Sequence, residues 1–334
     1  MSNHLTHILQ EWLKRKTSHE WALGVVANTE GPVYRKTGAI MLLSDRGDQL
    51  GMLSGGCLEG DILLHAQRAI LKNESTRVIY DANEKGGLAW RLGIGCGGKA
   101  EIVIHPCNSA NHFLELEQLH QTLSAQRPAT YNLNLEHAEA TISASSHASS
   151  GNSLNTTEIF SHNNSQWLRI HAQPRPHLVI SGAGVDMQPI AALAAQLGWK
   201  VTLVDSRQAN ARQRHFPSAD NVFCCSIDEL PQDTLAQCDA LIIANHNLNM
   251  DAQALKAAQL SSARYVGLLG PAARREKIFA LAEIKESDSK AIAGPMGLAL
   301  GNDLPESIAL SVLAECHAVL FGSSGQPLSN HYWN

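Results

Sequence analysis

A strand, a glycine turn, a helix and a second strand follow one another in HLVISGAGVDMQPIAALAAQLGWKVTLVD, residues 177–205, and this order constrains the fold most. In the turn, Gly182 permits a tight bend and Gly184 lets a phosphate approach backbone N–H groups at a helix N-terminus. Asp205, about 20 residues beyond the turn, stands where an acid accepts the hydroxyls of a ribose. Met187 fills the third position of the GxGxxG pattern, which departs from the fingerprint.

The glycine turn therefore predicts a phosphate-bearing ligand in this half of the chain. NAD(P), a nucleotide and some other phosphorylated cofactor all satisfy the pattern. The alternative is a Rossmann-like βαβ unit that binds nothing.

The strand-and-helix alternation continues through ALIIAN, YVGLLG and AIAG, which predicts an α/β domain over residues 177–323 with a Rossmann-like, doubly wound parallel sheet. Before it, AQPRPH, residues 172–177, holds two prolines and is expected to be the interdomain linker. Residues 1–171 alternate short β-rich runs with one clear helix, residues 58–71, and predict an N-terminal α+β domain. Its polar stretch, residues 108–165, is expected to form peripheral strands and loops.

Composition excludes several classes of protein. The 334 residues carry a net charge of −5 and a pI near 6.3, so no basic surface points to nucleic acid. No apolar run is long enough to span a membrane, and the N-terminus lacks the order of a signal peptide, which predicts a cytoplasmic protein. The 7 cysteines include no CxxC pair, so neither a disulfide framework nor a closed zinc site is expected.

Two of these cysteines have an unusual setting. Cys57 follows Gly55 and Gly56 and comes just before a helix with Glu59 in its first turn, while Cys96 lies between glycines in GIGCGGK, residues 93–99. Thiolates are favoured near a helix N-terminus, and glycine neighbours leave them accessible. Both are candidate nucleophiles or soft metal ligands, although a free cysteine is often a small buried hydrophobic residue. The flanking glycines, Gly55, Gly56, Gly95 and Gly97, belong to the same predicted cofactor-binding site, and so does Glu59.

Other candidate ligand contacts lie near glycine turns and strand ends. Arg35 follows the GPVY turn, where a cation suits an anionic ligand or stays a solvated surface charge. His246 follows a strand, at the edge where open α/β sheets bind ligands. Gly294 and Gly297 make the loop before the last helix bendable enough to close over a ligand.

These segments together resemble the XdhC/CoxI family of molybdoenzyme maturation factors. The resemblance rests on RKTGAIML, LSGGCLEGDI and GIGCGGKAEIVIHP in the first half and on GAGVDMQPIAALAAQLGWKVTLVDSR, NHNLNMD, YVGLLGP and GPMGLALGNDLPESIALSVLAE in the second. The sequence departs from the family at Tyr34, where proline is often found, and at Pro271 and Ala272, where Ser-Arg is expected.

The resemblance implies a protein that binds molybdenum cofactor, a phosphorylated pterin dithiolene (molybdopterin) that holds molybdenum. It also implies that the protein assists exchange of an oxo for a sulfido ligand, supplied by a cysteine desulfurase, before insertion into a xanthine dehydrogenase-type enzyme. Cys57 is then a candidate molybdenum ligand, and Cys96 shares that task or relays sulfur. A homodimer is a further expectation from the resemblance.

Two other functions stay open from the sequence. An NAD(P)-dependent oxidoreductase would use the Rossmann turn and Asp205 but leave both cysteine motifs without a role. A structural adaptor between a desulfurase and a dehydrogenase would bind proteins and no cofactor.

Overall fold

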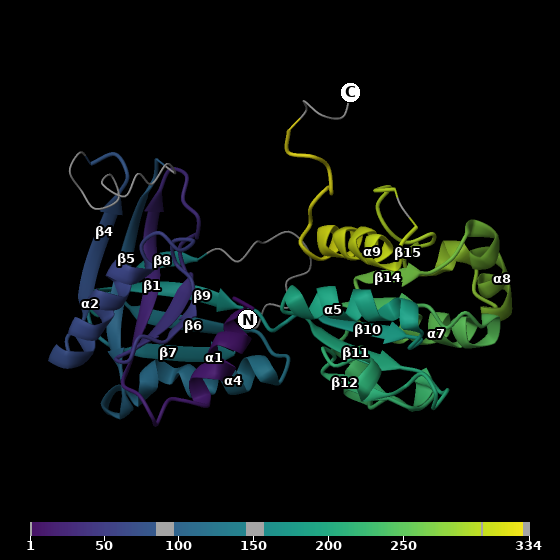
Figure 1. Ribbon diagram of the computed structural model, residues 1–334, viewed down its shortest axis with the longest axis horizontal. Coiled ribbons are helices and arrows are strands. Elements are labelled where there is room, and N and C mark those ends of the chain that lie inside the picture. The colour runs from purple at the N-terminus through teal and green to yellow at the C-terminus, as the bar shows by residue number, and fades with distance from the viewer. Residues whose placement is uncertain (1, 85–96, 145–156, 302, 330–334) are drawn as a thin grey trace. The chain divides into compact units, whose positions relative to one another are not determined.

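The computed structural model describes residues 2–84, 97–144, 157–301 and 303–329 (Figure 1). The chain divides into two compact units, Met1–Pro174 and Arg175–Asn334. The division falls within the segment AQPRPH. In the described residues, no helix is both long and apolar enough to cross a membrane.

The N-terminal unit contains two antiparallel sheets. The first has five strands in the order β3-β2-β1-β5-β4, and the second has four in the order β7-β6-β9-β8. The elements are α1 (Leu5–Leu13), β1 (Trp21–Glu30), β2 (Ile40–Ser44), β3 (Gln49–Gly51), α2 (Glu59–Lys72), β4 (Thr76–Asp81), β5 (Lys99–Cys107), η1 (Ser109–Glu115), α4 (Leu116–Ser124), β6 (Ala129–Asn134), β7 (Ala140–Ala144), β8 (Glu158–His162) and β9 (Ser165–Ala172).

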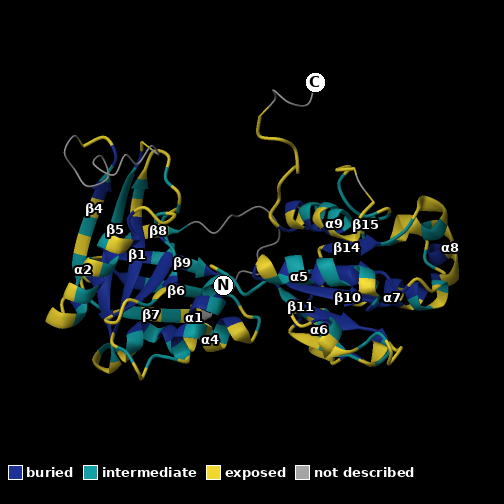
Figure 2. Ribbon diagram, viewed as in Figure 1, coloured by how far each residue is buried: buried dark blue, intermediate teal, exposed yellow. Residues whose placement is uncertain are grey.

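Strand β1 separates two hydrophobic cores because its side chains alternate between the faces of the sheet. Ala22 and Val26 face α2, whereas Leu23 and Val25 face α1, α4 and the second sheet. Both faces are buried, as Figure 2 shows for the middle of this unit. This arrangement confirms the predicted N-terminal α+β domain.

The expectation that residues 108–165 are peripheral is wrong. Leu119, Tyr131 and Leu133 are fully buried and belong to the same core as Trp12 of α1. In β6 the polar residues Thr130 and Asn132 alternate with buried ones, so the polar composition of the stretch hides an apolar face. The second sheet therefore supplies much of the core on that side of β1.

The C-terminal unit is a six-stranded parallel sheet in the order β12-β11-β10-β13-β14-β15. Helices α5 and α9 cover one face of the sheet, and α7 and α8 cover the other. The elements are β10 (His177–Ser181), η2 (Val185–Met187), α5 (Gln188–Gln196), β11 (Lys200–Val204), η3 (Gln213–His215), β12 (Asn221–Phe223), η4 (Ile227–Glu229), α6 (Gln232–Ala236), β13 (Ala240–Ile243), α7 (Leu248–Leu260), β14 (Tyr265–Leu268), α8 (Ala272–Ala282), η5 (Glu286–Asp288), β15 (Ile292–Ala293) and α9 (Pro305–Leu320).

This topology confirms the predicted doubly wound Rossmann-like sheet. The order of strands reverses direction between β10 and β13, and ligands of such sheets bind beyond the carboxyl ends of the strands at that switch point. Strand β12 was not predicted, because its three residues include only two apolar side chains, Val222 and Phe223. The predicted helix after the glycine turn starts as the 3₁₀ turn η2 and becomes α-helical at Gln188.

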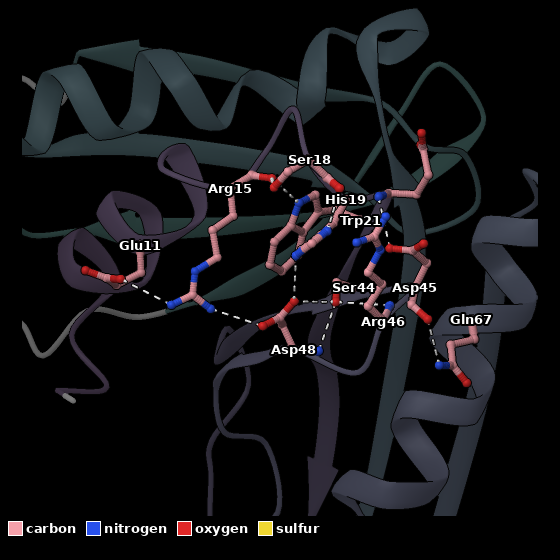
Figure 3. Close-up of polar contacts among 11 residues, drawn as sticks. Glu11, Arg15, Ser18, His19, Trp21, Ser44, Asp45, Arg46, Asp48 and Gln67 are labelled. Carbon is pink, nitrogen blue, oxygen red and sulfur yellow. Dashed lines mark hydrogen bonds and ion pairs between the residues drawn. The ribbon is translucent and has the colours of Figure 1, made fainter.

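A polar cluster in the N-terminal unit fixes the turn between β2 and β3 (Figure 3). The Asp48 carboxylate accepts a hydrogen bond from Arg15 Nη1 at 3.0 Å and one from Ser44 Oγ at 2.8 Å, and it lies 3.3 Å from His19 Nε2. Asp45, in the same turn, accepts a bond from the backbone N–H of Glu20 at 3.1 Å. The turn is thus attached to the segment that follows α1.

We expect Asp48→Ala to lower the free energy of unfolding of the N-terminal unit by about 1–2 kcal/mol, because the variant loses a partly exposed ion pair and a hydroxyl bond. Urea unfolding followed by tryptophan fluorescence measures the change. Glu74→Ala is the control, since Glu74 is exposed and its side chain makes no ion pair within the described residues. Equal free energies of unfolding for the two variants would contradict the role of Asp48 in fixing the turn between β2 and β3.

Candidate functional site

The loop before α2 presents Cys57 to solvent. Leu53 and Leu58 are buried and anchor the two ends of the loop in the core beneath α2. Between them, Gly55 and Gly56 have φ angles of 80° and 104°, a region that side chains rarely adopt. The reversed backbone leaves Cys57 exposed, two residues before the first residue of α2.

The Glu59 carboxylate holds this loop in shape. It accepts bonds from the backbone N–H groups of Leu53 (3.2 Å), Ser54 (2.7 Å), Gly56 (2.8 Å) and Leu58 (3.3 Å), and from the Ser54 hydroxyl. Burial by itself would raise the pKa of Glu59, but the bonds from Ser54 and the loop backbone outweigh it and lower that pKa. Glu59 was predicted to contact a cofactor; its carboxylate is instead occupied by its own loop.

One segment, Gly31 to Tyr34, contacts both glycine motifs of the first domain. The Tyr34 ring lies on Gly55, and the Pro32 carbonyl approaches Gly98 so closely that a Cβ there would lie 2.2 Å from its oxygen. Gly97 has a φ of 68°, and a Cβ added at this position would have no atom within 4 Å. The segment thus brings two distant motifs to one edge of the domain. Gly95 and Cys96 lie outside the described residues.

Arg35 continues this segment and is half-buried. Its Nε atom is inaccessible to solvent and has no hydrogen-bond partner in the described structure. Buried donors are rarely left unpaired, because an unmade bond costs about 1–3 kcal/mol. In this conformation the N–H is out of reach of an external acceptor, so it could meet an anionic group only if the side chain moved.

Within its described residues, the first-domain site offers one soft donor for a metal. Among these residues, no group of three or more His, Cys, Asp or Glu side chains is arranged to hold an ion. Of the two described cysteines of this domain, Cys57 is exposed and Cys107 is buried in the core, and burial raises the pKa of the Cys107 thiol. A metal at Cys57 would need most of its ligands from a bound molecule.

The glycine turn of the second domain lies at the switch point of the sheet. Gly182 has a φ of 113°, and a Cβ there would lie 2.3 Å from the Ala244 carbonyl oxygen, so only glycine fits. Its N–H donates to the Val204 carbonyl at 2.8 Å. Gly182 therefore packs between the ends of β11 and β13, as a tight Rossmann turn requires.

Two side chains close this turn where a phosphate was predicted. Gly184 has an ordinary φ of −65°, and a Cβ there would lie 2.4 Å from Asp186 Oδ1. The other oxygen of Asp186 lies 2.9 Å from Nε2 of His246, whose φ is 56°. A carboxylate thus faces the open side of Gly184, and its negative charge opposes the approach of a pyrophosphate.

Asp205 is buried and fully engaged within the protein. Its oxygens accept bonds from Arg207 Nε at 2.8 Å, Arg207 Nη2 at 2.7 Å, Asn210 Nδ2 at 3.1 Å, and the backbone N–H groups of Ala183 and Arg207. Burial opposes ionisation, but the bonds from Arg207 and its neighbours lower the pKa of Asp205 to about 2. In this conformation, the ribose contact predicted from its position would require displacement of Arg207.

A small pocket lies beside this network at the carboxyl ends of the strands, and its empty volume of about 250 Å³ includes space open to solvent. Its lining comes from β10, β11, the segments after β12 and β13, and α7, and includes Ser181, Asp205, Ser206, Cys225, Ser226 and Asn245. Asn245 donates to Asp251 at 3.1 Å, and Arg274 donates to the other Asp251 oxygen at 2.6 Å. These bonds make the pocket wall rigid.

The loop with Gly294 and Gly297 is attached to α9. The Gly297 N–H donates to Glu315 at 2.8 Å, and a Cβ at Gly297 would lie 2.4 Å from Ser311 Oγ. A Cβ at Gly294 would lie 2.8 Å from Arg275 Cδ. Both glycines permit close packing in this structure, which differs from the expected role of a bendable cover.

Sequence reasoning missed three side chains at these sites. Asp186 lies inside the glycine motif and Arg207 lies two residues after Asp205, so both could have been found by asking which neighbours carry charge. Tyr34 had a weaker signal, because one aromatic residue in a glycine-proline turn has no characteristic pattern.

The fold and the sites define a two-domain protein in which an α+β domain presents a thiol on a glycine loop and a Rossmann domain carries a separate pocket. Residues 178–316 match the family model described as the XdhC Rossmann domain, and residues 15–81 match that of the XdhC and CoxI family. The chain belongs to the XdhC and CoxI family.

Two curated relatives match over most of their length. A Bacillus subtilis protein, described as a probable xanthine dehydrogenase subunit, is 28% identical over 322 residues, which cover 89% of this chain and 92% of that protein. The "molybdenum cofactor insertion chaperone PaoD" of Escherichia coli is 24% identical over 302 residues, which cover 89% of this chain and 82% of that protein.

A solved structure has the same fold. A crystal structure described as a xanthine dehydrogenase from Bacillus halodurans aligns with a TM-score of 0.79 at 24% identity, over 99% of this chain and 98% of that one.

We expect Glu59→Gln to destabilise the N-terminal unit by about 2 kcal/mol at neutral pH, because four backbone donors lose an ionised acceptor. The folded pKa of Glu59 is lowered, so its stabilisation is complete above the ordinary value of 4.5 and is lost as the pH falls through the lower folded value. The difference between wild type and variant, measured by urea unfolding, should therefore shrink below pH 4.5. Glu74→Gln, beyond the other end of α2, should show no such pH dependence.

Proposed function

We propose that this protein binds molybdenum cofactor and acts as an insertion chaperone for a xanthine dehydrogenase-type enzyme. The observation that carries the proposal is the exposed Cys57 thiol on a glycine loop that the Glu59 carboxylate holds in shape. Family membership and the name of the Escherichia coli relative support it.

The donor set of the site suits this cargo. Thiolate is a soft ligand, and the described first domain offers one such exposed donor without a surrounding cluster of ligands. Molybdenum cofactor has dithiolene sulfurs of its own that bind the metal. A single thiolate from the protein would therefore add to an existing set of metal ligands. The cofactor also carries a phosphate, and Arg35, a cation next to the residue that contacts the thiol loop, is a candidate partner for it.

The finer steps of this function are also proposals. A cysteine desulfurase supplies sulfur for the sulfido ligand, Cys96 shares metal binding with Cys57 or relays that sulfur, and the loaded cofactor passes to the client dehydrogenase. We expect a homodimer and, because the work depends on a reduced thiol, a cytoplasmic location.

The second candidate function is an NAD(P)-dependent oxidoreductase, and the strand order and the pocket near Asp205 favour a nucleotide in the Rossmann domain. Two features oppose a dinucleotide: Asp186 faces the position of the pyrophosphate, and Arg207 occupies the carboxylate that would bind the ribose. We therefore place the chaperone first.

We expect purified protein to show no saturable binding of NADH or NADPH below about 1 mM, because a carboxylate stands at the phosphate position. Titration followed by nicotinamide fluorescence measures this. Micromolar binding that Gly182→Val abolishes would instead favour the oxidoreductase.

We expect wild-type protein, incubated anaerobically with released molybdenum cofactor and then separated from it, to retain molybdenum and pterin in near-equal amounts. Cys57→Ser should lower the retained molybdenum by roughly tenfold or more, because a hydroxyl is a much poorer soft donor. Cys224→Ser is the matched control, since Cys224 is an exposed thiol of the other domain. Metal analysis and pterin fluorescence give the two readouts.

Failure of wild type to retain molybdenum would remove the chaperone proposal. If the Cys57→Ser variant still retains molybdenum, the metal-binding role belongs to another thiol. Cys96→Ser would be the next variant.

A further inference from the structure

Tyr34 lies beside the thiol loop in an unusual position for a large aromatic residue. It is 65% exposed, yet its ring contacts the backbone at Gly55. A Cβ at Gly55 would lie 3.0 Å from Cγ, 3.1 Å from Cδ2 and 3.2 Å from Cδ1 of the ring. Nearly equal distances to these three atoms mean that Gly55 lies under one face of the ring rather than at its edge.

The contact depends on glycine for two reasons. Gly55 has a φ of 80°, which disfavours a side chain, and a Cβ there would lie so close to the ring that the ring would have to shift. One face of Tyr34 is thereby placed on a backbone that Glu59 holds through the neighbouring N–H groups of Ser54 and Gly56. The high exposure of Tyr34 leaves its other face open.

The two loops that meet at this contact carry further groups suited to a ligand. A Cβ at Gly56, next to Gly55, would have no atom within 4 Å, so the backbone there borders open space. Cys57 follows and is exposed. Arg35, next to Tyr34, has an unpaired Nε. An aromatic ring, an exposed thiol and a cation thus lie on two short loops that contact each other.

We propose that Tyr34 is a stacking platform for the pterin ring of the molecule whose metal Cys57 binds. A pterin is a flat heteroaromatic bicycle, and such rings stack on an exposed aromatic side chain whose position is already fixed. The proposal rests on the proposed function for the identity of the ligand and adds to it a residue that recognises the organic part of the cofactor.

The alternative is that Tyr34 only covers the loop. An aliphatic side chain of similar size would then serve as well as an aromatic one, whereas stacking requires a ring. The phenolic oxygen is not needed for stacking, so removal of the hydroxyl alone should change little.

The test uses the full chain and a probe without metal, the fluorescent pterin phosphate obtained when molybdenum cofactor is oxidised. Wild type, Tyr34→Phe, Tyr34→Trp and Tyr34→Leu are compared by quenching of the pterin fluorescence. We expect the Phe and Trp variants to bind about as tightly as wild type and Tyr34→Leu to bind roughly tenfold more weakly. Leu71→Ala, at an exposed position on α2, is the control and should bind as wild type does.

A second readout separates stacking from loop structure. The rate at which a thiol reagent labels Cys57, located by mass spectrometry, should be the same in all variants if the loop keeps its shape. Equal affinity of the Leu and Phe variants, or a Leu variant whose labelling rate changes in step with its affinity, would overturn the proposal.

The outcome is independent of the chaperone experiment. Absence of pterin binding by wild type would overturn the Tyr34 proposal while molybdenum retention through Cys57 could still hold. If pterin binding depends on the aromatic ring but wild type retains no molybdenum, stacking on Tyr34 would be supported. The proposed function would then lose its metal-binding step.

Discussion

The ionised carboxylate of Glu59 is the interaction on which the thiol site depends. The loop from Leu53 to Leu58 turns backbone N–H groups toward this carboxylate. The Leu58 N–H also donates to Ser54 Oγ, whereas the N–H groups of Leu53, Ser54 and Gly56 would lose their acceptor without Glu59. An acid at the first residue of α2 satisfies them and also lies where the helix dipole favours negative charge. The loop can then keep two glycines in left-handed conformations and leave the thiol that follows them free for a ligand.

Glycine serves a different purpose in each domain. In the first, Gly55 and Gly98 let the segment that includes Pro32 and Tyr34 pack on two loops at once. In the second, Gly182 allows β10 to end against the Ala244 carbonyl. The second domain keeps the strand order of a dinucleotide-binding sheet, while Asp186 and His246 fill the turn with polar groups of its own. The strand order thus favours a dinucleotide, whereas the side chains at the glycine turn oppose its pyrophosphate.

The sequence predicted elements whose apolar pattern is regular and failed where the partners of a side chain decide its role. Strands such as β10 and β13 are continuous apolar runs, and their parallel pairing follows from the helices between them. The spacing of Asp205 from the glycine turn gave its place in the fold, but only the structure shows that Arg207 takes its oxygens. Likewise, Glu59 was recognised as an acid near Cys57, and its five donors were invisible because four of them are backbone groups.

A carrier must release what it binds, and the sparse donor set of the first domain bears on that step. Within the described residues the thiol of Cys57 has no companion ligands arranged around a common point. If Cys57 alone holds the metal, an incoming donor would need to replace a single sulfur to free it from the protein. The metal–protein bond would then be lost in one ligand-exchange event, which a client could accelerate, instead of by the stepwise dismantling of a chelate.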